Sequence, residues 1–346
     1  MSWPVVGHAR ISDVLTKSVS AGRVPQTLLF AGPPGIGKFA TAIALAQAVN
    51  CPNSGTPEPR NLGTSEPRNP GTPCGACATC ERISKRQFSD VVVVDRGDYA
   101  SISIKVVREK ILALIGYRPF EGQKRVFIVD GADDLTWEAQ DSLLKTLEEP
   151  PPAAILILIA TSPDAMKATV LSRCRRLRFG TLSDADVARV LQDKMGMDAA
   201  SARSRAAIAG GSVGQALAID GGTLEEDREL AMAFLEASAS PSLGPRLKAA
   251  AALSAVQEKK RRSREAVSTR LAHVSSLLRD LGITATGELS HGSLANQDMA
   301  DALGRLARAF PPDRLIPAFG TVARAQSALD RNASAKVVAD WVAASL

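Results

Sequence analysis

A segment near the start of the chain has the residue types and spacing of a phosphate-binding loop. It reads Gly-Pro-Pro-Gly-Ile-Gly-Lys and joins an apolar run that predicts a strand to an Ala- and Leu-rich run that predicts a helix. In such a loop, backbone N–H groups point at phosphate oxygens, the helix start adds its positive dipole end, and the lysine reaches the terminal phosphates. We favour this function over a glycine turn that only connects two elements. The predicted phosphate-binding residues are Gly32, Gly35, Gly37 and Lys38.

Two groups that ATP hydrolysis requires are missing around this loop. The position after Lys38 normally carries a Ser or Thr hydroxyl that binds magnesium, but here it is Phe39, and Thr41 lies on a different face of the helix. A later strand ends at Asp130, which can contact a metal ion, but Gly131 follows where a glutamate would activate water. The sequence therefore predicts a vestigial nucleotide site that binds ATP or ADP weakly or not at all.

Four cysteines form a second cluster with metal-binding spacing. Cys74, Cys77 and Cys80 are separated by two residues each, and Cys51 precedes them, whereas Cys174 stands apart. Two-residue spacing lets a tight turn present thiolates to one tetrahedral ion, and a site with four cysteines and no open position is typical of structural zinc. An iron–sulfur cluster and a redox cysteine pair are the less favoured alternatives. The Pro- and Gly-rich repeat between Cys51 and Cys74 is interpreted as a disordered surface insertion.

The pattern of apolar runs predicts an α/β domain followed by helices. Continuous apolar runs predict buried parallel strands, and helical spacing lies between them. Asp133 and Asp134 are interpreted as a polar loop and a helix cap, not as catalytic acids. The predicted strands are 26–31, 90–95, 125–130 and 154–160, and the predicted helices are 39–49, 104–115, 136–147, 184–194, 201–209, 224–237, 246–281, 297–310 and 313–346. The predicted domains are 1–180, 181–240 and 241–346.

Composition agrees with a modular, α-rich protein. The chain has 346 residues, of which 45% are apolar and only 4% aromatic, and its formal charge is +6. No secretory signal and no long apolar run is present, so we expect a cytoplasmic protein without a membrane partner. The basic run from Lys259 to Arg264 could face DNA, but a solvated helix face is the favoured interpretation because no aromatic residues interleave with it.

Several motifs together resemble the clamp-loader subunits of bacterial DNA polymerase III. The resemblance is strong over residues 1–180 and fades beyond them. It is carried by Val6-Gly7-His8, the phosphate loop, the four-cysteine insertion, the run Leu143-Leu-Lys-Thr-Leu-Glu-Glu-Pro-Pro151 and Ser172-Arg173-Cys174, and later by Gly210-Gly-Ser212 and Asn332-Ala-Ser-Ala-Lys336.

The resemblance implies an AAA+ fold, with a P-loop domain, a small helical lid and a helical collar that joins five subunits. It also implies that Arg173 projects into the ATP site of a neighbouring subunit as an arginine finger, where a guanidinium neutralises charge developing on the γ-phosphate. From spacing alone, a surface arginine paired with an acidic neighbour is an equal alternative. Implied partners are the other clamp-loader subunits, tau/gamma and delta, the sliding clamp and primed DNA, within a DNA polymerase III holoenzyme.

A third vacancy distinguishes this chain from the hydrolysing members of that family. Those subunits carry an arginine in the lid shortly after Gly-Ser, but here Ser212 is followed by Val213, Gly214 and Gln215. The vacancies match the delta prime type, a stator that does not hydrolyse ATP, better than the tau/gamma motor. The alternative is a working AAA+ ATPase with unusual substitutions.

Overall fold

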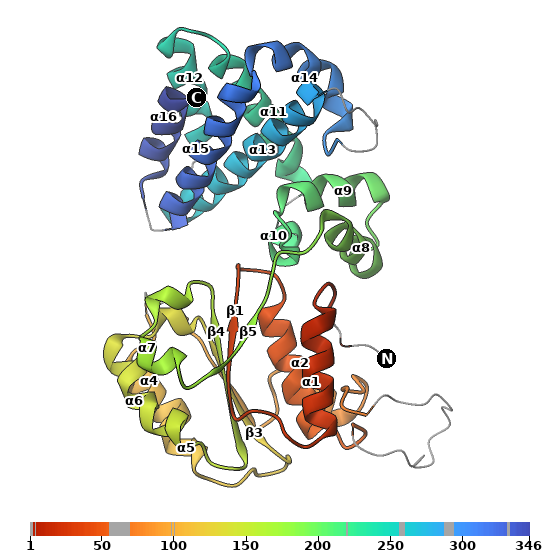
Figure 1. Cartoon of the computed structure of the whole chain (residues 1–346), viewed down its shortest axis with the longest axis vertical. Helices are drawn as coiled ribbons and strands as arrows, with labels where there is room; N and C mark the ends of the chain where they lie inside the picture. Colours follow the sequence, from red (N-terminus) through yellow and green to blue (C-terminus); the bar gives the residue numbers. More distant parts are fainter. Residues whose placement is uncertain are drawn as a thin grey trace. The chain divides into compact units, whose positions relative to one another are not determined.

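The apolar runs that predict buried strands form one five-stranded parallel sheet in the computed structural model (Figure 1). Every residue of β4 (Ala154–Ala160) is buried, which explains its continuous apolar sequence. The strand order is β2-β3-β4-β1-β5. The other strands are β1 (Thr27–Ala31), β2 (Val91–Val94), β3 (Arg125–Asp130) and β5 (Arg175–Arg178).

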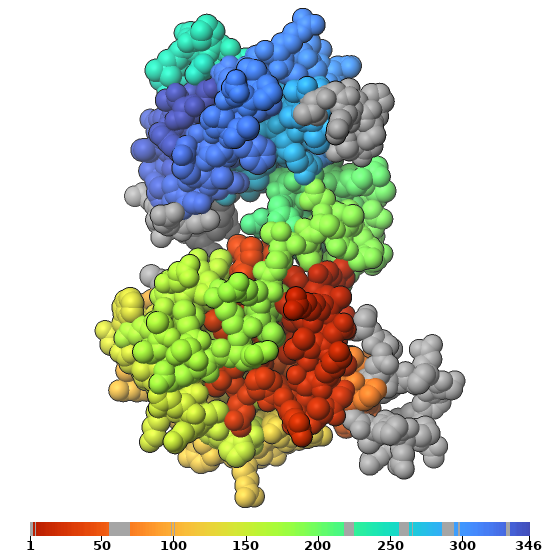
Figure 2. Space-filling model, viewed as in Figure 1, coloured from red at the N-terminus to blue at the C-terminus, as the bar shows by residue number. Residues whose placement is uncertain are grey.

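Helices cover both faces of this sheet. Successive side chains of β1 alternate between two cores, with Phe30 packing on one side and Leu29 on the other. One face carries α1 (Ala9–Ser20) and α2 (Lys38–Asn50), and the other carries α4 (Ile104–Val107), the π-helical turn Arg108–Leu112, α5 (Ala113–Ile115), α6 (Trp137–Glu148) and α7 (Ala168–Leu171). In the ribbon view α1 and α2 lie on one side of the strands and α6 and α7 on the other (Figure 1), and the space-filling view shows the corresponding red and yellow-green surfaces on opposite sides of this unit (Figure 2).

The edge strand β5 and the short helix α3 (Ala78–Ser84) are elements that the apolar patterns do not predict. β5 reads Arg-Arg-Leu-Arg, and its arginines are exposed because the strand pairs with β1 alone. Charged residues are common on edge strands, where they discourage pairing with another chain. Its exposure therefore removes the apolar signal by which the other strands are recognised.

Beyond β5 the chain contains only helices among the residues that the structure describes, which are 3, 5–54, 70–97, 99, 101–218, 221–255, 260–286, 294–330 and 333–346. The predicted fold class, an AAA+ type α/β domain with a parallel sheet followed by helices, is thus confirmed. None of the described helices is long and apolar enough to cross a bilayer. The helices are α8 (Asp184–Met195), α9 (Ala199–Ile208), α10 (Val213–Ala218), α11 (Gly221–Ser238), α12 (Leu243–Ser254), α13 (Lys260–Thr286), α14 (Ala300–Leu306), α15 (Pro312–Asp330) and α16 (Ala335–Ser345).

Two long helices predicted from spacing are each divided in the structure. The predicted helix 246–281 is α12 and α13, because α12 ends at Ser254 and α13 begins at Lys260. Arg270 of α13 donates to the carbonyls of Leu253 and Ala255, so a guanidinium from the next helix satisfies the open end of α12. The predicted helix 313–346 is likewise α15 and α16. Both divisions depend on packing that helical periodicity does not record.

The chain forms two compact units, Met1–Leu182 and Ser183–Leu346. The first agrees with the predicted P-loop domain to within two residues. In the second, α11 precedes residue 240 but contributes Phe234 and Leu235 to the apolar core formed by α12, α13, α15 and α16. The division of the helical part at residue 240 therefore stays a prediction.

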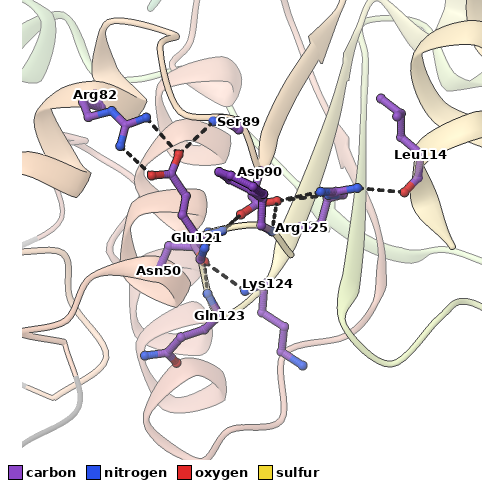
Figure 3. Close-up of polar contacts among 11 residues, drawn as sticks. Asn50, Arg82, Ser89, Asp90, Leu114, Glu121, Gln123, Lys124 and Arg125 are labelled. Carbon is purple, nitrogen blue, oxygen red and sulfur yellow. Dashed lines mark hydrogen bonds and ion pairs between the residues drawn. The ribbon is translucent and has the colours of Figure 1, made fainter. Parts of the chain in front are cut away.

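A buried carboxylate fixes the loop that leads into β3 (Figure 3). Asp90 is fully buried and accepts the N–H groups of Phe120, Glu121 and Gly122, all at 2.8 Å. It also pairs with the Arg125 guanidinium at 2.9 Å. Burial by itself raises the pKa of the Asp90 carboxyl, but these hydrogen bonds outweigh it and hold the pKa below its usual value. The loop and the start of β3 are thus held by one charge.

We expect Asp90→Asn to lower the free energy of unfolding by about 3–5 kcal/mol near pH 7, because the arginine and the N–H groups lose a buried anion. Because folding depresses this pKa, the wild-type advantage is present above the ordinary Asp pKa of about 3.9 and is lost as pH falls below it. Urea unfolding of both proteins across this pH range measures it. Asp141→Asn, at an exposed pair with Lys167, is the matched control and should cost under about 1 kcal/mol. Equal losses at the two positions would contradict the account.

Candidate functional site

The predicted phosphate loop lies between the carboxyl end of β1 and the start of α2. Gly35 and Gly37 have left-handed backbones, with φ of 69° and 97°, so glycine suits both positions. Gly32 has a different constraint: a Cβ atom there would lie 2.2 Å from the carbonyl oxygen of Phe179. Close packing against the segment after β5 therefore requires glycine at this position, whatever the loop binds.

Partners within the chain hold this loop. The Lys38 ammonium is buried and donates to the carbonyls of Gly32 and Pro33. Burial lowers the pKa of Lys38, while the nearby carboxylates of Asp133 and Asp130 oppose that shift. His8 donates from Nε2 to the carbonyl of Ile36 at 2.8 Å. The amine that a P-loop offers to phosphate is thus engaged by its own loop.

The residues at the magnesium position do not fit the ion that P-loop chemistry uses. Phe39, in place of a hydroxyl residue, packs against the core below α2. The Thr41 hydroxyl donates to the carbonyl of Gly37 at 2.9 Å, so this hydroxyl is bound to the backbone four residues earlier. Burial, followed by repulsion from Asp95, raises the pKa of Asp130, while Lys38 partly opposes it. With an apolar ring in place of the hydroxyl, the loop lacks the oxygen ligand that a P-loop supplies to the hard cation.

The turn after β3 also departs from that of a hydrolysing site. Gly131 has φ of 84°, and a Cβ atom there would lie 2.9 Å from Asp134 Oδ2, so a glutamate at this position would be strained. Asp133 accepts the N–H groups of Thr161 and Ser162 at 3.0 and 2.8 Å. The structural role expected for Asp133 is therefore observed, but it joins the turns after β3 and β4. The cap of α6 comes from Thr136.

The four predicted metal ligands meet in one place. The sulfur atoms of Cys51, Cys74, Cys77 and Cys80 all lie within 4.8 Å of one another, and the Cys51–Cys77 and Cys74–Cys80 pairs are each 3.9 Å apart. A tetrahedral zinc ion with bonds of ~2.3 Å would place its sulfurs about 3.8 Å apart. The cluster can therefore hold a metal ion. Cys174 lies elsewhere, and burial raises the pKa of its thiol to about 12, as suits an inert core residue.

Hydrogen bonds around the cluster favour thiolates. The amides of Cys77 and Cys80 donate to the sulfurs of Cys74 and Cys77, at 3.3 and 3.4 Å. A hydrogen bond from Cys80 lowers the pKa of Cys51 to about 5, and the same contact raises the pKa of Cys80, so one proton is lost readily from this pair. Gln47 of α2 donates to the carbonyl of Cys80 and to the hydroxyl of Ser84, both at 2.8 Å. The cysteine module is thereby tied to the P-loop helix.

Arg173 lies at the end of α7, far along the chain from the other candidate residues. Its guanidinium pairs with Glu148 Oε1 at the end of α6 and donates to the carbonyl of Thr169 at 2.9 Å. The side chain is about one-third exposed, at 35%. The structure therefore places a half-exposed arginine beside an acidic neighbour, which was one of the two alternatives for this residue. An arginine finger requires the same exposure.

The remaining expected features lie in the second unit. Ser212 caps α10 by accepting the N–H of Gln215 at 3.1 Å, and Gly214 follows inside that helix. Lys259 lies outside the described residues, so DNA contact by the basic run stays a prediction. The 52–73 insertion is described only at its two ends, 52–54 and 70–73.

Three site residues escape local sequence reasoning. Asp95 follows β2 as directly as Asp130 follows β3, so the rule that marks strand ends could have found it. Arg86 and Glu148 carry no local signal, because each acts on a residue at least 25 positions away. Only the fold brings such pairs together.

The comparisons with known proteins concern the first unit above all. Subunit tau of DNA polymerase III from Escherichia coli (strain K12) is 31% identical over 178 residues, which are 51% of this chain and 25% of that protein. The Bacillus subtilis (strain 168) tau subunit is 33% identical over 176 residues, 51% of this chain and 28% of that protein. The chain thus spans about a quarter of the length of these relatives.

Among solved structures, a DNA polymerase III gamma subunit-related protein from Thermotoga maritima aligns over 96% of this chain and 97% of its own, with 15% identity and a TM-score of 0.42. The family model described as DNA polymerase III, delta subunit, matches residues 7–183. This match covers just over half of the 346 residues and includes the phosphate loop, the cysteine cluster and Arg173. It confirms the resemblance drawn from the motifs: the chain belongs to the DNA polymerase III delta subunit family of clamp-loader proteins.

Proposed function

We propose that this chain is the delta prime type stator of a bacterial clamp loader, a subunit that keeps the motor fold without hydrolysing ATP. The observation that carries the proposal is the P-loop itself, whose Lys38 is bound to its own loop while Phe39 occupies the magnesium-ligand position. In this role it assembles in the cytoplasm with tau/gamma and delta subunits in a hetero-pentamer. It helps to load the sliding clamp on primed DNA, and its lid and collar hold the ring together.

The chemistry of the site supports a rigid part in preference to a motor. A hydrolysing site needs a metal ligand after the lysine and a base beside Asp130, and both positions are filled by residues without polar side chains. Gly131 cannot be exchanged for a base without strain. When bound, magnesium would supply charge neutralisation on the terminal phosphates, but these residues do not hold it. Lys38 and the loop amides could at most contact phosphate.

Arg173 is the residue that we assign to catalysis in the neighbouring subunit. A guanidinium at an intersubunit ATP site stabilises the charge that develops on the γ-phosphate. Glu148 and the Thr169 carbonyl bind the Arg173 guanidinium. The ion pair with Glu148 is exposed, so the guanidinium can exchange the carboxylate for a phosphate. The finger is therefore presented in a fixed direction before assembly.

A working ATPase of the tau/gamma type is the second candidate, favoured by the identity to tau subunits and by Lys38.

We expect the purified chain to show no ATP turnover above that of Lys38→Ala. A steady-state phosphate-release assay with magnesium measures it. Turnover that disappears in Lys38→Ala would establish the enzyme and exclude the stator.

The finger proposal is tested in the reconstituted complex, with the P-loop lysines of the other ATP sites substituted so that only the site next to this chain works. Arg173→Ala should leave assembly intact, by gel filtration, and lower single-turnover hydrolysis at that site by about 10³-fold. Arg175→Ala, an exposed arginine two positions away on β5, is the matched control and should have little effect. Similar rates for Arg173→Ala and wild type would exclude the finger.

We further propose that the four cysteines hold one structural zinc ion, because their sulfurs have tetrahedral spacing and no open position. Elemental analysis should give about one zinc per chain, lost in Cys77→Ser/Cys80→Ser. Chelation should lower the melting temperature of the wild type and leave that of the double variant unchanged. Cys174→Ser is the control and should retain the metal. Iron with visible absorbance, or no metal at all, would contradict the assignment.

A further inference from the structure

Among the described residues, Arg86 is the one non-glycine residue with a left-handed backbone. Its φ is 56°, in the turn that follows α3, and its N–H donates to the carbonyl of Ile83 at 3.0 Å. A side chain in this conformation costs about 1–2 kcal/mol, and glycine avoids the cost. The N–H of Gln87 also donates to the carbonyl of Arg82 at 2.8 Å, so Arg86 is the left-handed residue of a Schellman cap that ends α3, and these two hydrogen bonds offset the cost of its backbone.

The guanidinium of Arg86 lies over Phe39. Its Cζ atom is 4.9 Å from the centre of the ring, within the range of a cation–π contact. Phe39 directly follows Lys38 and occupies the position that gives a P-loop its metal-binding hydroxyl. The arginine thus contacts the residue that replaces the magnesium ligand of a P-loop.

Three carboxylates share this end of the sheet. Asp95 and Asp130 follow the paired residues Val94 and Val129, so they leave adjacent parallel strands side by side, and Asp133 lies in the next turn. The charged groups that act on Asp130 are Asp95 and Asp133, which raise its pKa, and Lys38 and Arg86, which lower it. Arg96, which follows Asp95, pairs with Asp134 at 3.5 Å, whereas Lys38 and Arg86 are the two positive groups that act on Asp130, and the Lys38 ammonium is bound to its own loop.

The position of Arg86 is set from outside the sheet. Gln47 of α2 binds the Cys80 carbonyl and the Ser84 hydroxyl, which fixes α3 along the P-loop helix two residues before Arg86. The packing of the cysteine module against α2 thereby places Arg86 beside Phe39.

We propose that Arg86 is a built-in cation that replaces the divalent metal ion at this P-loop. Held on the Phe39 ring, its guanidinium balances the carboxylate of Asp130 and excludes magnesium, so the loop does not bind a magnesium–nucleotide. This inference rests on the proposed function in one respect, that the loop is not a hydrolytic site, and it names the residue that keeps the loop free of metal.

The test measures binding of a fluorescent ATP analogue to the full-length chain, with magnesium or with EDTA. We compare the wild type, Phe39→Thr, Arg86→Gly and the double variant Phe39→Thr/Arg86→Gly. Glycine suits the backbone at residue 86, so folding is preserved, and circular dichroism and melting confirm it. The control is Phe39→Thr/Lys85→Ala, which removes an exposed positive charge from the neighbouring position.

We expect magnesium-dependent binding in the double variant, at least about tenfold tighter with magnesium than with EDTA, and weaker magnesium-dependent binding in Phe39→Thr and in the Lys85 control, which keep the positive charge of Arg86. Magnesium-dependent binding by the wild type would overturn the proposal, and so would binding by Phe39→Thr or the Lys85 control as tight as that of the double variant, or a double variant that binds no better than wild type. These outcomes are separate from the stator proposal, which fails on ATP turnover by the unaltered chain and not on binding.

Discussion

The constraint on which the molecule depends is a parallel sheet buried on both faces. Every residue of the central strand β4 is buried, and helices cover both of its sides, so polar side chains have no place within it. They collect where the strands end. The phosphate loop follows β1, Asp95 follows β2 and Asp130 ends β3, and parallel pairing brings these ends to one edge. The functional edge is therefore a consequence of burying the strands.

At that edge, partners from the same chain satisfy the charges that a ligand would meet in a hydrolysing subunit. Lys38 is bound to loop carbonyls, His8 holds Ile36, and the amides after β4 occupy Asp133. Such internal pairing lowers the gain from binding a nucleotide, because each contact must first be exchanged.

How far the sequence predicts the molecule depends on whether the signal is local. The four buried strands are predicted correctly because each is a continuous apolar run, and the clustering of the cysteines because three of the four are only two residues apart. The edge strand β5 is missed because its exposed arginines carry no apolar pattern. The ends of α12 and α15 are missed because the helical spacing of apolar residues continues past them. The end of α12 depends on contacts from a later segment, such as the hydrogen bonds that Arg270 donates to its last carbonyls.

The sequence by itself determined which chemical groups this protein has and which it lacks: a P-loop lysine, four thiols at metal-binding spacing, and Phe39 and Gly131 at positions where hydrolysis needs polar groups. Those are properties of residue type and spacing, which folding does not change. Only the tertiary structure decided what these groups contact. That Lys38 bonds to its own loop and that Arg86 lies over Phe39 follow from the packing of α3 on α2 and of the loop on the sheet. Side-chain contacts between distant segments depend on that packing, and no local pattern encodes them.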